Sequence, residues 1–518
     1  MRVYALLLAA AAVVAPTLAG SSTTALNTVQ SSAANSTTSS GSSSSSLPTV
    51  ELDYTTVQAV GGNTTVGYYK HQNIRFAKVP SGDLRFAAPE WPDVETEINT
   101  RKLANIDVEC KTSEDRQYLD VWPPANAAGR NLPVIVWTYG GSFPGGSKSE
   151  NTPEGLFDLI QDFVFVAYNY RVGITGLTNG PAYQHEGGVS NPYVWDSTHA
   201  FEWVQKYISK FGGNPNDVTA AGFSAGASQV MFQMTRFGGN APQLFQKAYI
   251  MSPGYVPGAG HHTPSSSGRM YRPPWAARVA TWTACARYRS TIWSMLPTPS
   301  WTRTRTRCSL AWTAGHHEAN SHEYSGVETQ EDVSTYLRIF FPGISDDAVD
   351  KLLELYPEAD YESAGLRFAD MKQSFDLTAK NLALTNALNN QTWNAQVSLG
   401  EATHCFDQNY YWYSTYSLST ASESSSATTS SLSSDEAASV GAVTTTVNAT
   451  IAVMMQKYLM SFVLAGNPNS IWADDKIYWP LYNESRVGTQ IVFNDTFTVA
   501  DDDLANAKRL FWNKALWY

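Results

Sequence analysis

Two near-continuous apolar runs constrain the fold of this 518-residue chain more than any other feature of its sequence. Residues 132–139 (LPVIVWTY) and 163–170 (FVFVAYNY) have the length of β-strands, and neither alternates between apolar and polar residues. Strands without alternation are typical of a parallel sheet that is covered on both faces. The two runs therefore predict a central sheet between two layers of helices.

Helical and strand patterns alternate along the chain around these runs. Residues 195–211 place their apolar side chains on one helical stripe, residues 217–221 have the pattern of a short strand, and a helix follows from residue 225. Residues 247–252 then have the pattern of a further strand. Strands that alternate with helices predict the α/β class, with a mostly parallel central sheet and helices on both faces.

The N-terminus has the anatomy of an exported protein. Residues 1–19 combine Arg2, a short apolar run and small residues, which predicts a cleaved signal peptide, because the run is too short to span a bilayer. Residues 20–47 form a Ser/Thr-rich leader whose composition predicts disorder. Residues 48–518 are expected to form a single domain. The apolar residues 447–465 are interrupted by Gln456 and Lys457 and predict a packed helix.

We therefore expect a secreted, extracellular protein with no integral membrane segment in the mature chain. The four cysteines can form up to two disulfides after export. The net charge of −11 argues against nucleic acid as a partner. N-glycosylation sequons occur at Asn35, Asn63, Asn390, Asn448, Asn483 and Asn494.

Residues 258–314 differ abruptly in composition from the rest of the domain. They contain no Asp, Glu, Lys, Asn, Gln or Phe, but hold eight arginines and five of the 16 tryptophans. Translation in a shifted frame, or of an unspliced intron, accounts for this change better than a genuine basic insertion does. The arginines show no helical or strand spacing, so a patch for an anionic surface is the less favoured interpretation.

The chemistry of the chain is indicated by the pentapeptide at 222–226, which satisfies G-x-S-x-G. It lies between a predicted strand and a predicted helix, where a sharp turn exposes the hydroxyl of Ser224 as a nucleophile. A serine nucleophile also needs donors for the oxyanion of the tetrahedral intermediate. The glycine loop after residues 132–138 offers the amides of Gly141 and Ser142, and Ala225 offers a third.

Several long motifs in a fixed order resemble the type-B carboxylesterase/lipase family, which includes the cholinesterases, and above all its secreted fungal members. They include residues 74–92 (IRFAKVPSGDLRFAAPEWP), 132–147 (LPVIVWTYGGSFPGGS) and 201–228 (FEWVQKYISKFGGNPNDVTAAGFSAGAS). The resemblance covers residue 48 to the C-terminus, apart from the anomalous block. It implies an α/β-hydrolase fold and makes His404, in the segment THCFDQNYY, the match to the general base.

The resemblance also implies an acid that orients the imidazole and stabilises its protonated form. Counting back from the segment SGVETQEDVSTYL favours Glu318, counting forward from Gly315 gives Asn320, and Glu323 is a third choice. The chain departs from the family at Phe223, where a glutamate is usual, and at Arg116, where a cysteine is usual.

These residues predict a secreted serine hydrolase that cleaves carboxylic esters, of small molecules or lipids, through an acyl-enzyme. Ser224 is the expected nucleophile, His404 the base and Glu318 the acid, with no metal or organic cofactor. The alternatives are a non-catalytic binding protein of the same fold and an inactive pseudo-enzyme. No motif in the sequence identifies the natural substrate, distinguishes a lipase from an esterase, or indicates the oligomeric state.

Overall fold

The computed structural model divides the chain into two units, Met1–Ser46 and Leu47–Tyr518. Only parts of the second unit are described below, and for residues 309–315 only the backbone is described. The described residues are 47–100, 114–254, 309–315, 323–400, 402, 404–414, 447–482 and 488–513.

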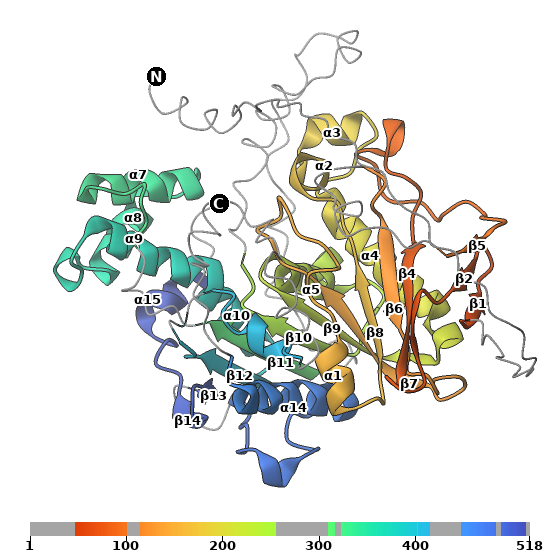
Figure 1. The fold of residues 1–518 in the computed structure, drawn as a ribbon. Coiled ribbons are helices and arrows are strands. Elements are labelled where there is room, and N and C mark those ends of the chain that lie inside the picture. Colours follow the sequence, from red (N-terminus) through yellow and green to blue (C-terminus); the bar gives the residue numbers. More distant parts are fainter. Residues whose placement is uncertain are drawn as a thin grey trace, which may run out of the picture. The chain divides into compact units, whose positions relative to one another are not determined.

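Eleven of the described strands form one mixed sheet, in the order β14-β13-β12-β11-β10-β9-β7-β8-β6-β4-β3 (Figure 1). Its middle, from β8 to β13, is parallel throughout, and the antiparallel pairs lie toward the two edges. The strands are β3 (Gly61–Asn63), β4 (Tyr68–Arg75), β6 (Tyr118–Trp122), β7 (Leu132–Thr138), β8 (Val164–Tyr168), β9 (Gly213–Phe223), β10 (Lys247–Met251), β11 (Ser309–Gly315), β12 (Thr392–Val397), β13 (Thr489–Phe493) and β14 (Thr498–Asp501). A separate small sheet contains β1 (Thr49–Glu51), β2 (Thr56–Gln58) and β5 (Ile98–Asn99).

Helices cover both faces of the large sheet, and strand β7 contributes side chains to the core on each face. Val134 and Val136 belong to a core cluster that includes apolar residues of α4 and α5, whereas Ile135 and Trp137 belong to a cluster with α1 and α14. Successive side chains of a strand point to opposite faces, so a strand between two helical layers has to be apolar at every position. The predicted fold class is confirmed.

The helices predicted at 195–211, from residue 225 and at 447–465 are present. The apolar stripe at 195–211 lies in α4 and the 3-10 turn after it, and the late apolar segment forms α14. Their bounds, with those of the other helices, are α1 (Glu154–Leu159), α2 (Gly173–Leu177), α3 (Pro181–His185), α4 (Pro192–Tyr207), η4 (Ile208–Phe211), α5 (Ala225–Thr235), α7 (Gln330–Phe340), α8 (Asp346–Leu355), α9 (Ala364–Gln373), α10 (Ala379–Ala387), α11 (Gln408–Tyr411), α14 (Ala449–Ala465) and α15 (Ala507–Leu510).

A third core cluster lies among α7, α8, α9 and the residues that follow α15. Between α9 and α10 the helix widens into one π-helical turn, η9 (Ser374–Thr378). Such turns are rare and are frequent at functional sites. This turn brings Asp376 close to the predicted nucleophile.

The end of the anomalous block forms part of the sheet. Strand β11 pairs in parallel with β10 through five residues, from Lys247 with Ser309 to Met251 with Thr313, and also pairs in parallel with β12. The rest of the block, and the Ser-rich stretch 417–434, lie outside the described residues. Residues 309–314 therefore fit the fold in register, although their composition is unusual.

Candidate active site

Ser224 is the single residue between strand β9 and helix α5, and its backbone is strained. Its φ is 52° and its ψ is −122°, a combination that residues with a side chain rarely adopt. Its N–H donates to the carbonyl of Met251 at 2.9 Å, and its carbonyl accepts from the N–H of Ser228 at 3.0 Å. These bonds fix a sharp turn that raises the hydroxyl above the carboxyl ends of the parallel strands.

The two glycines of the pentapeptide are required by close backbone approaches. A Cβ on Gly226 would lie 2.1 Å from the carbonyl oxygen of Thr138 on β7, and one on Gly222 would lie 2.6 Å from the carbonyl oxygen of Gly226. Both distances are shorter than any real contact, so the turn can form only where side chains are absent. The spacing G-x-S-x-G therefore has a steric cause in this chain.

His404 is brought to Ser224 from 180 residues away along the chain, on the segment that follows β12. Its Nε2 lies 2.8 Å from the Oγ of Ser224, a hydrogen-bond distance. The ring of Phe223 packs against the imidazole with 4.9 Å between ring centroids. Phe223 therefore limits the orientations of His404. The sequence marked Phe223 only as a departure from the family and did not predict this contact.

The glycine loop after β7 lies directly against the nucleophile. A Cβ on Gly140 would lie 3.0 Å from the Cβ of Ser224. Gly141 has a φ of 110° and Ser142 a φ of 51°, so both peptide groups are turned from the strand direction. Ala225 is the first residue of α5, and no carbonyl inside a helix can accept the N–H of its first residue. Ala225 thus follows Ser224 directly, and Gly141 and Ser142 follow the glycine that contacts it, but their role as oxyanion donors stays a prediction.

The predicted acid, Glu318, and its alternative Asn320 lie outside the described residues. Glu323 is described and exposed, and its Cγ lies beside Gly365 of α9, where an added Cβ would approach it to 2.3 Å. In the described part of the chain, no hydrogen bond or ion pair joins Glu323 to His404. The structure thus offers no support for this third choice.

Two carboxylates in this region were not predicted as site residues from the sequence: the partly buried Asp376, and the buried Asp407, three residues after His404. Asp376 lies on η9, where burial raises its pKa, but the nearby Lys372 and Lys380 outweigh burial and lower the pKa of Asp376 overall. Burial lowers the pKa of Lys380 to about 7. Asp407 directly precedes the short helix α11 without capping it through its side chain, and burial raises its pKa to about 6. No motif marks Asp376, because Gly254 and Ser224, which lie near it, are far from it in the sequence.

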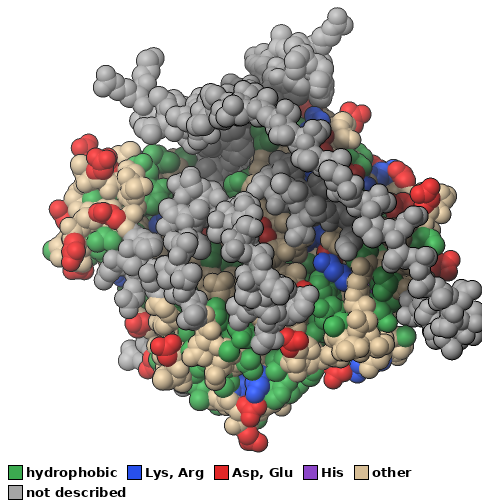
Figure 2. Space-filling model, in the orientation of Figure 1, with side chains coloured by type: hydrophobic (Ala, Val, Ile, Leu, Met, Phe, Trp, Pro, Cys, Tyr) green, Lys and Arg blue, Asp and Glu red, His purple; other side chains and the backbone are tan. Residues whose placement is uncertain are grey.

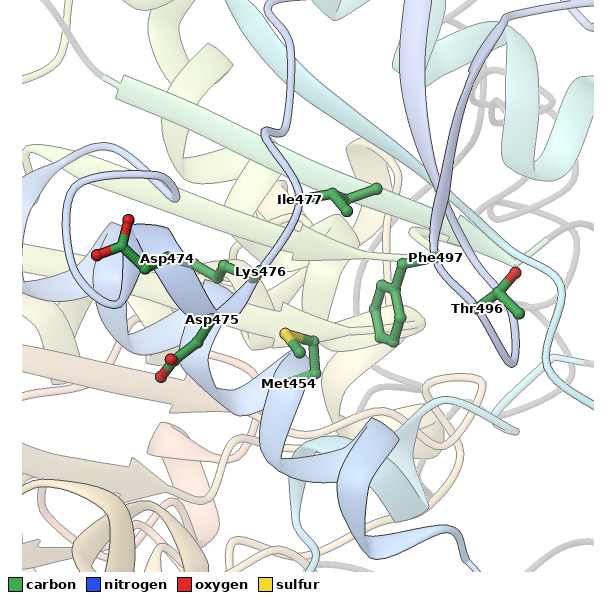
Figure 3. Close-up of a pocket in the computed structure, with 7 residues that line it drawn as sticks. All are labelled: Met454, Asp474, Asp475, Lys476, Ile477, Thr496 and Phe497. Carbon is green, nitrogen blue, oxygen red and sulfur yellow. The ribbon is translucent and has the colours of Figure 1, made fainter.

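A cavity of about 320 Å³ lies apart from these residues (Figure 3). The side chains that line it come from α14 and from the segments before β13 and β14, and none is a predicted site residue. They are Met454, Asp474, Asp475, Lys476, Ile477, Thr496 and Phe497. Across the described residues, no group of three or more His, Cys, Asp or Glu side chains is arranged to hold a metal ion.

The parallel sheet, the strained serine at the end of β9 and the glycine loop beside it define an α/β hydrolase. The structure is similar to that of Aspergillus niger EstA, with a TM-score of 0.67 over 90% of this chain and 98% of that one, at 20% identity. A second solved structure, a PNB esterase, gives a TM-score of 0.65 over 90% of this chain and 99% of that one, also at 20% identity.

Residues 47–297 of this chain match the model of the carboxylesterase family. Carboxylesterase patB of Penicillium expansum is 30% identical over 276 residues, which are 41% of this chain and 49% of that protein. A secreted lipase of Arthroderma benhamiae is 37% identical over 27% of this chain and 30% of that protein. The matches thus span about half, or less, of the length of these relatives. The resemblance predicted from the motifs is confirmed.

Proposed function

We propose that this protein is a secreted hydrolase of carboxylic esters, with Ser224 as the nucleophile of an acyl-enzyme mechanism. The observation that carries the proposal is the 2.8 Å distance between the Oγ of Ser224 and the Nε2 of His404. A serine hydroxyl needs a neighbouring base to become an effective nucleophile, and an imidazole at this distance can accept its proton.

In the acylation step, the Oγ of Ser224 forms a bond to the ester carbonyl carbon while His404 accepts the hydroxyl proton. The amides of Gly141, Ser142 and Ala225 hold the oxyanion of the tetrahedral intermediate. His404 then gives the proton to the alkoxy oxygen, the bond to that oxygen breaks and the alcohol leaves. Water, deprotonated by His404, releases the acid in the same way, and Glu318 orients the imidazole.

Export is supported by the N-terminal sequence and by the secreted lipase among the relatives. Asn63 and Asn448 are exposed, so two of the sequons are accessible to glycosylation. No helix within the described ranges is long and apolar enough to cross a bilayer. On the face shown in Figure 2, the described Lys and Arg side chains are scattered rather than gathered in one patch.

Hydrolysis of p-nitrophenyl butyrate by the secreted protein tests the proposal. Ser224→Ala should abolish turnover, because removal of a triad member costs about 10⁴-fold or more in rate. Ser197→Ala is the matched control: Ser197 is equally buried but donates to the carbonyl of Tyr193 inside α4, so activity should persist. Equal turnover by the wild type and Ser224→Ala contradicts the assignment, and no turnover by the wild type favours a non-catalytic protein.

The same assay tests the acid. Glu318→Gln should lower kcat strongly, because an amide cannot stabilise the imidazolium, whereas Glu323→Gln should leave kcat within a few-fold of the wild type. The reverse pattern would show that the chain uses a different acid.

A further inference from the structure

Asp376 faces the same space as the proposed nucleophile. A Cβ built on Gly254, just after β10, would lie 3.8 Å from the Oγ of Ser224 and 3.9 Å from the Oδ1 of Asp376. It would lie 3.7 Å from the Cδ2 of Leu377. All three are ordinary contact distances, so a small group fits at this point, beside both the hydroxyl and the carboxylate.

The two oxygens of Asp376 have different surroundings. Oδ2 accepts a hydrogen bond from the Nζ of Lys372 at 3.0 Å. Oδ1 is 3.5 Å from the Nζ of Lys380, but it accepts no hydrogen bond from any residue in the described part of the chain, although it is buried. A buried oxygen without a hydrogen bond is costly and calls for a cause. Here the oxygen borders the site where an ester would bind.

We propose that Asp376 is a specificity-determining residue that accepts a hydrogen bond from a hydroxyl group on the substrate, one or two carbons from the ester bond. This inference rests on the proposed function. The position of a Cβ on Gly254 lies within 4 Å of both the Oγ of Ser224 and the Oδ1 of Asp376. When the ester carbonyl carbon is at Ser224, a hydroxyl one or two carbons from the ester bond can therefore reach Asp376. The preferred substrates are therefore esters of hydroxy acids or monoesters of short diols.

The charges around Asp376 favour a hydroxyl over an ionised group on the substrate. Lys372 and Lys380 largely neutralise the carboxylate, so a substrate cation gains little from it. A substrate carboxylate at the same position would face Oδ1 at close range. A hydroxyl supplies the missing donor without either difficulty, and hydrogen bonds to charged acceptors are the stronger ones.

The test compares kcat/KM for paired substrates, so that any loss common to both members cancels. One pair is p-nitrophenyl 3-hydroxybutyrate and p-nitrophenyl butyrate, which places the hydroxyl on the acyl half. The other is 2-hydroxyethyl butyrate and propyl butyrate, followed by acid release, which places it on the alcohol half. The wild type should prefer the hydroxylated ester about tenfold or more in one pair, as a hydrogen bond to a charged group implies.

Two variants locate the cause of that preference. The double variant D376L/K380M removes the acceptor together with its buried cation, and a buried ion pair can often be replaced by apolar residues without loss of folding. Its ratio should fall toward one, whereas K380M alone, which keeps the acceptor, should retain the wild-type ratio. Gly254→Ala places a methyl group in the proposed hydroxyl position without changing any charge, and it should also lower the ratio.

This inference is overturned if kcat/KM is equal for the two members of each pair while plain esters are still hydrolysed in a Ser224-dependent manner. That result leaves the proposed function intact. A preference that survives in D376L/K380M also overturns it. If D376L/K380M does not fold, the ratio in Gly254→Ala decides. Absence of any ester hydrolysis by the wild type contradicts the proposed function and the inference together.

Discussion

Replacement of Lys148 by methionine should destabilise the protein by about 3–5 kcal/mol, the range for breaking a buried ion pair. The Nζ of Lys148 lies 2.7 Å from the Oδ1 of Asp120, and the exposed fractions of the two side chains are 0% and 4%. At such burial, water cannot screen the carboxylate that remains. The N–H of Asn73 also donates to Asp120, at 2.8 Å, but it carries no charge. The change therefore leaves a buried charge without its counter-ion.

The pair also connects stability to the proposed oxyanion loop. Lys148 follows the loop that contains Gly141 and Ser142, and its own N–H donates to the side chain of Asn169 at 2.8 Å. Loss of the ion pair should loosen this end of the loop, so Lys148→Met should lower kcat for p-nitrophenyl butyrate as well as stability. Oxyanion donors contribute only when they are held in position.

A double-mutant cycle separates the pair from its surroundings. Denaturant unfolding, followed by tryptophan fluorescence, is measured for the wild type, Lys148→Met, Asp120→Asn and the double variant. Asp120→Asn keeps an oxygen for the N–H of Asn73. The double variant should be less destabilised than the sum of the single variants, because neither charge remains unpaired. A cost below about 1 kcal/mol for Lys148→Met, or additive losses, would refute the reasoning.

Gly226→Ala should abolish activity or folding, because the added Cβ would overlap the carbonyl of Thr138. The control Gly61→Ala, which has no atom near its Cβ, should retain activity within a few-fold. Esterase assays on the soluble fraction of both variants test this prediction. Asp407→Asn should stabilise the protein by about 2–3 kcal/mol at pH 8, because burial raises the pKa of Asp407 to about 6 and the folded protein disfavours its charged form. The free energy of unfolding of the wild type should fall relative to that of Asp407→Asn as the pH rises from about 4 to about 6. Equal free energies of unfolding for the two proteins at pH 8 would contradict this prediction.

The sequence predicted the central elements of the fold because their patterns are strong and local. The apolar runs at 132–139 and 163–170 became β7 and β8, and the stripe at 195–211 became α4 with its final 3-10 turn. Ser224 was predictable because two steric requirements, at Gly222 and Gly226, impose a fixed spacing on adjacent residues. His404 required the family resemblance, because no local pattern connects residues that are 180 positions apart.

The contacts that sequence reasoning missed are all tertiary. The packing of Phe223 on His404 depends on how the segment after β12 returns to β9, and the place of Asp376 depends on a π-helical turn that widens an otherwise ordinary helix. Side chains on such a turn are displaced relative to α-helical spacing, so periodicity does not predict which way they point. The register of a helix with respect to a distant loop is set by packing rather than by local sequence.

The anomalous composition of residues 258–314 bears differently on folding and on catalysis. Strand β11, at the end of this block, pairs on both sides in a parallel ladder, so the sheet is continuous across it. The predicted acid, Glu318, comes only a few residues after this strand, and the carboxyl end of a parallel strand is where catalytic residues of open α/β sheets lie. A shift of two residues in the register of β11 would preserve the faces of the strand, and hence its packing. If Glu318 is the acid, as proposed, activity should therefore be more sensitive than stability to changes in this segment.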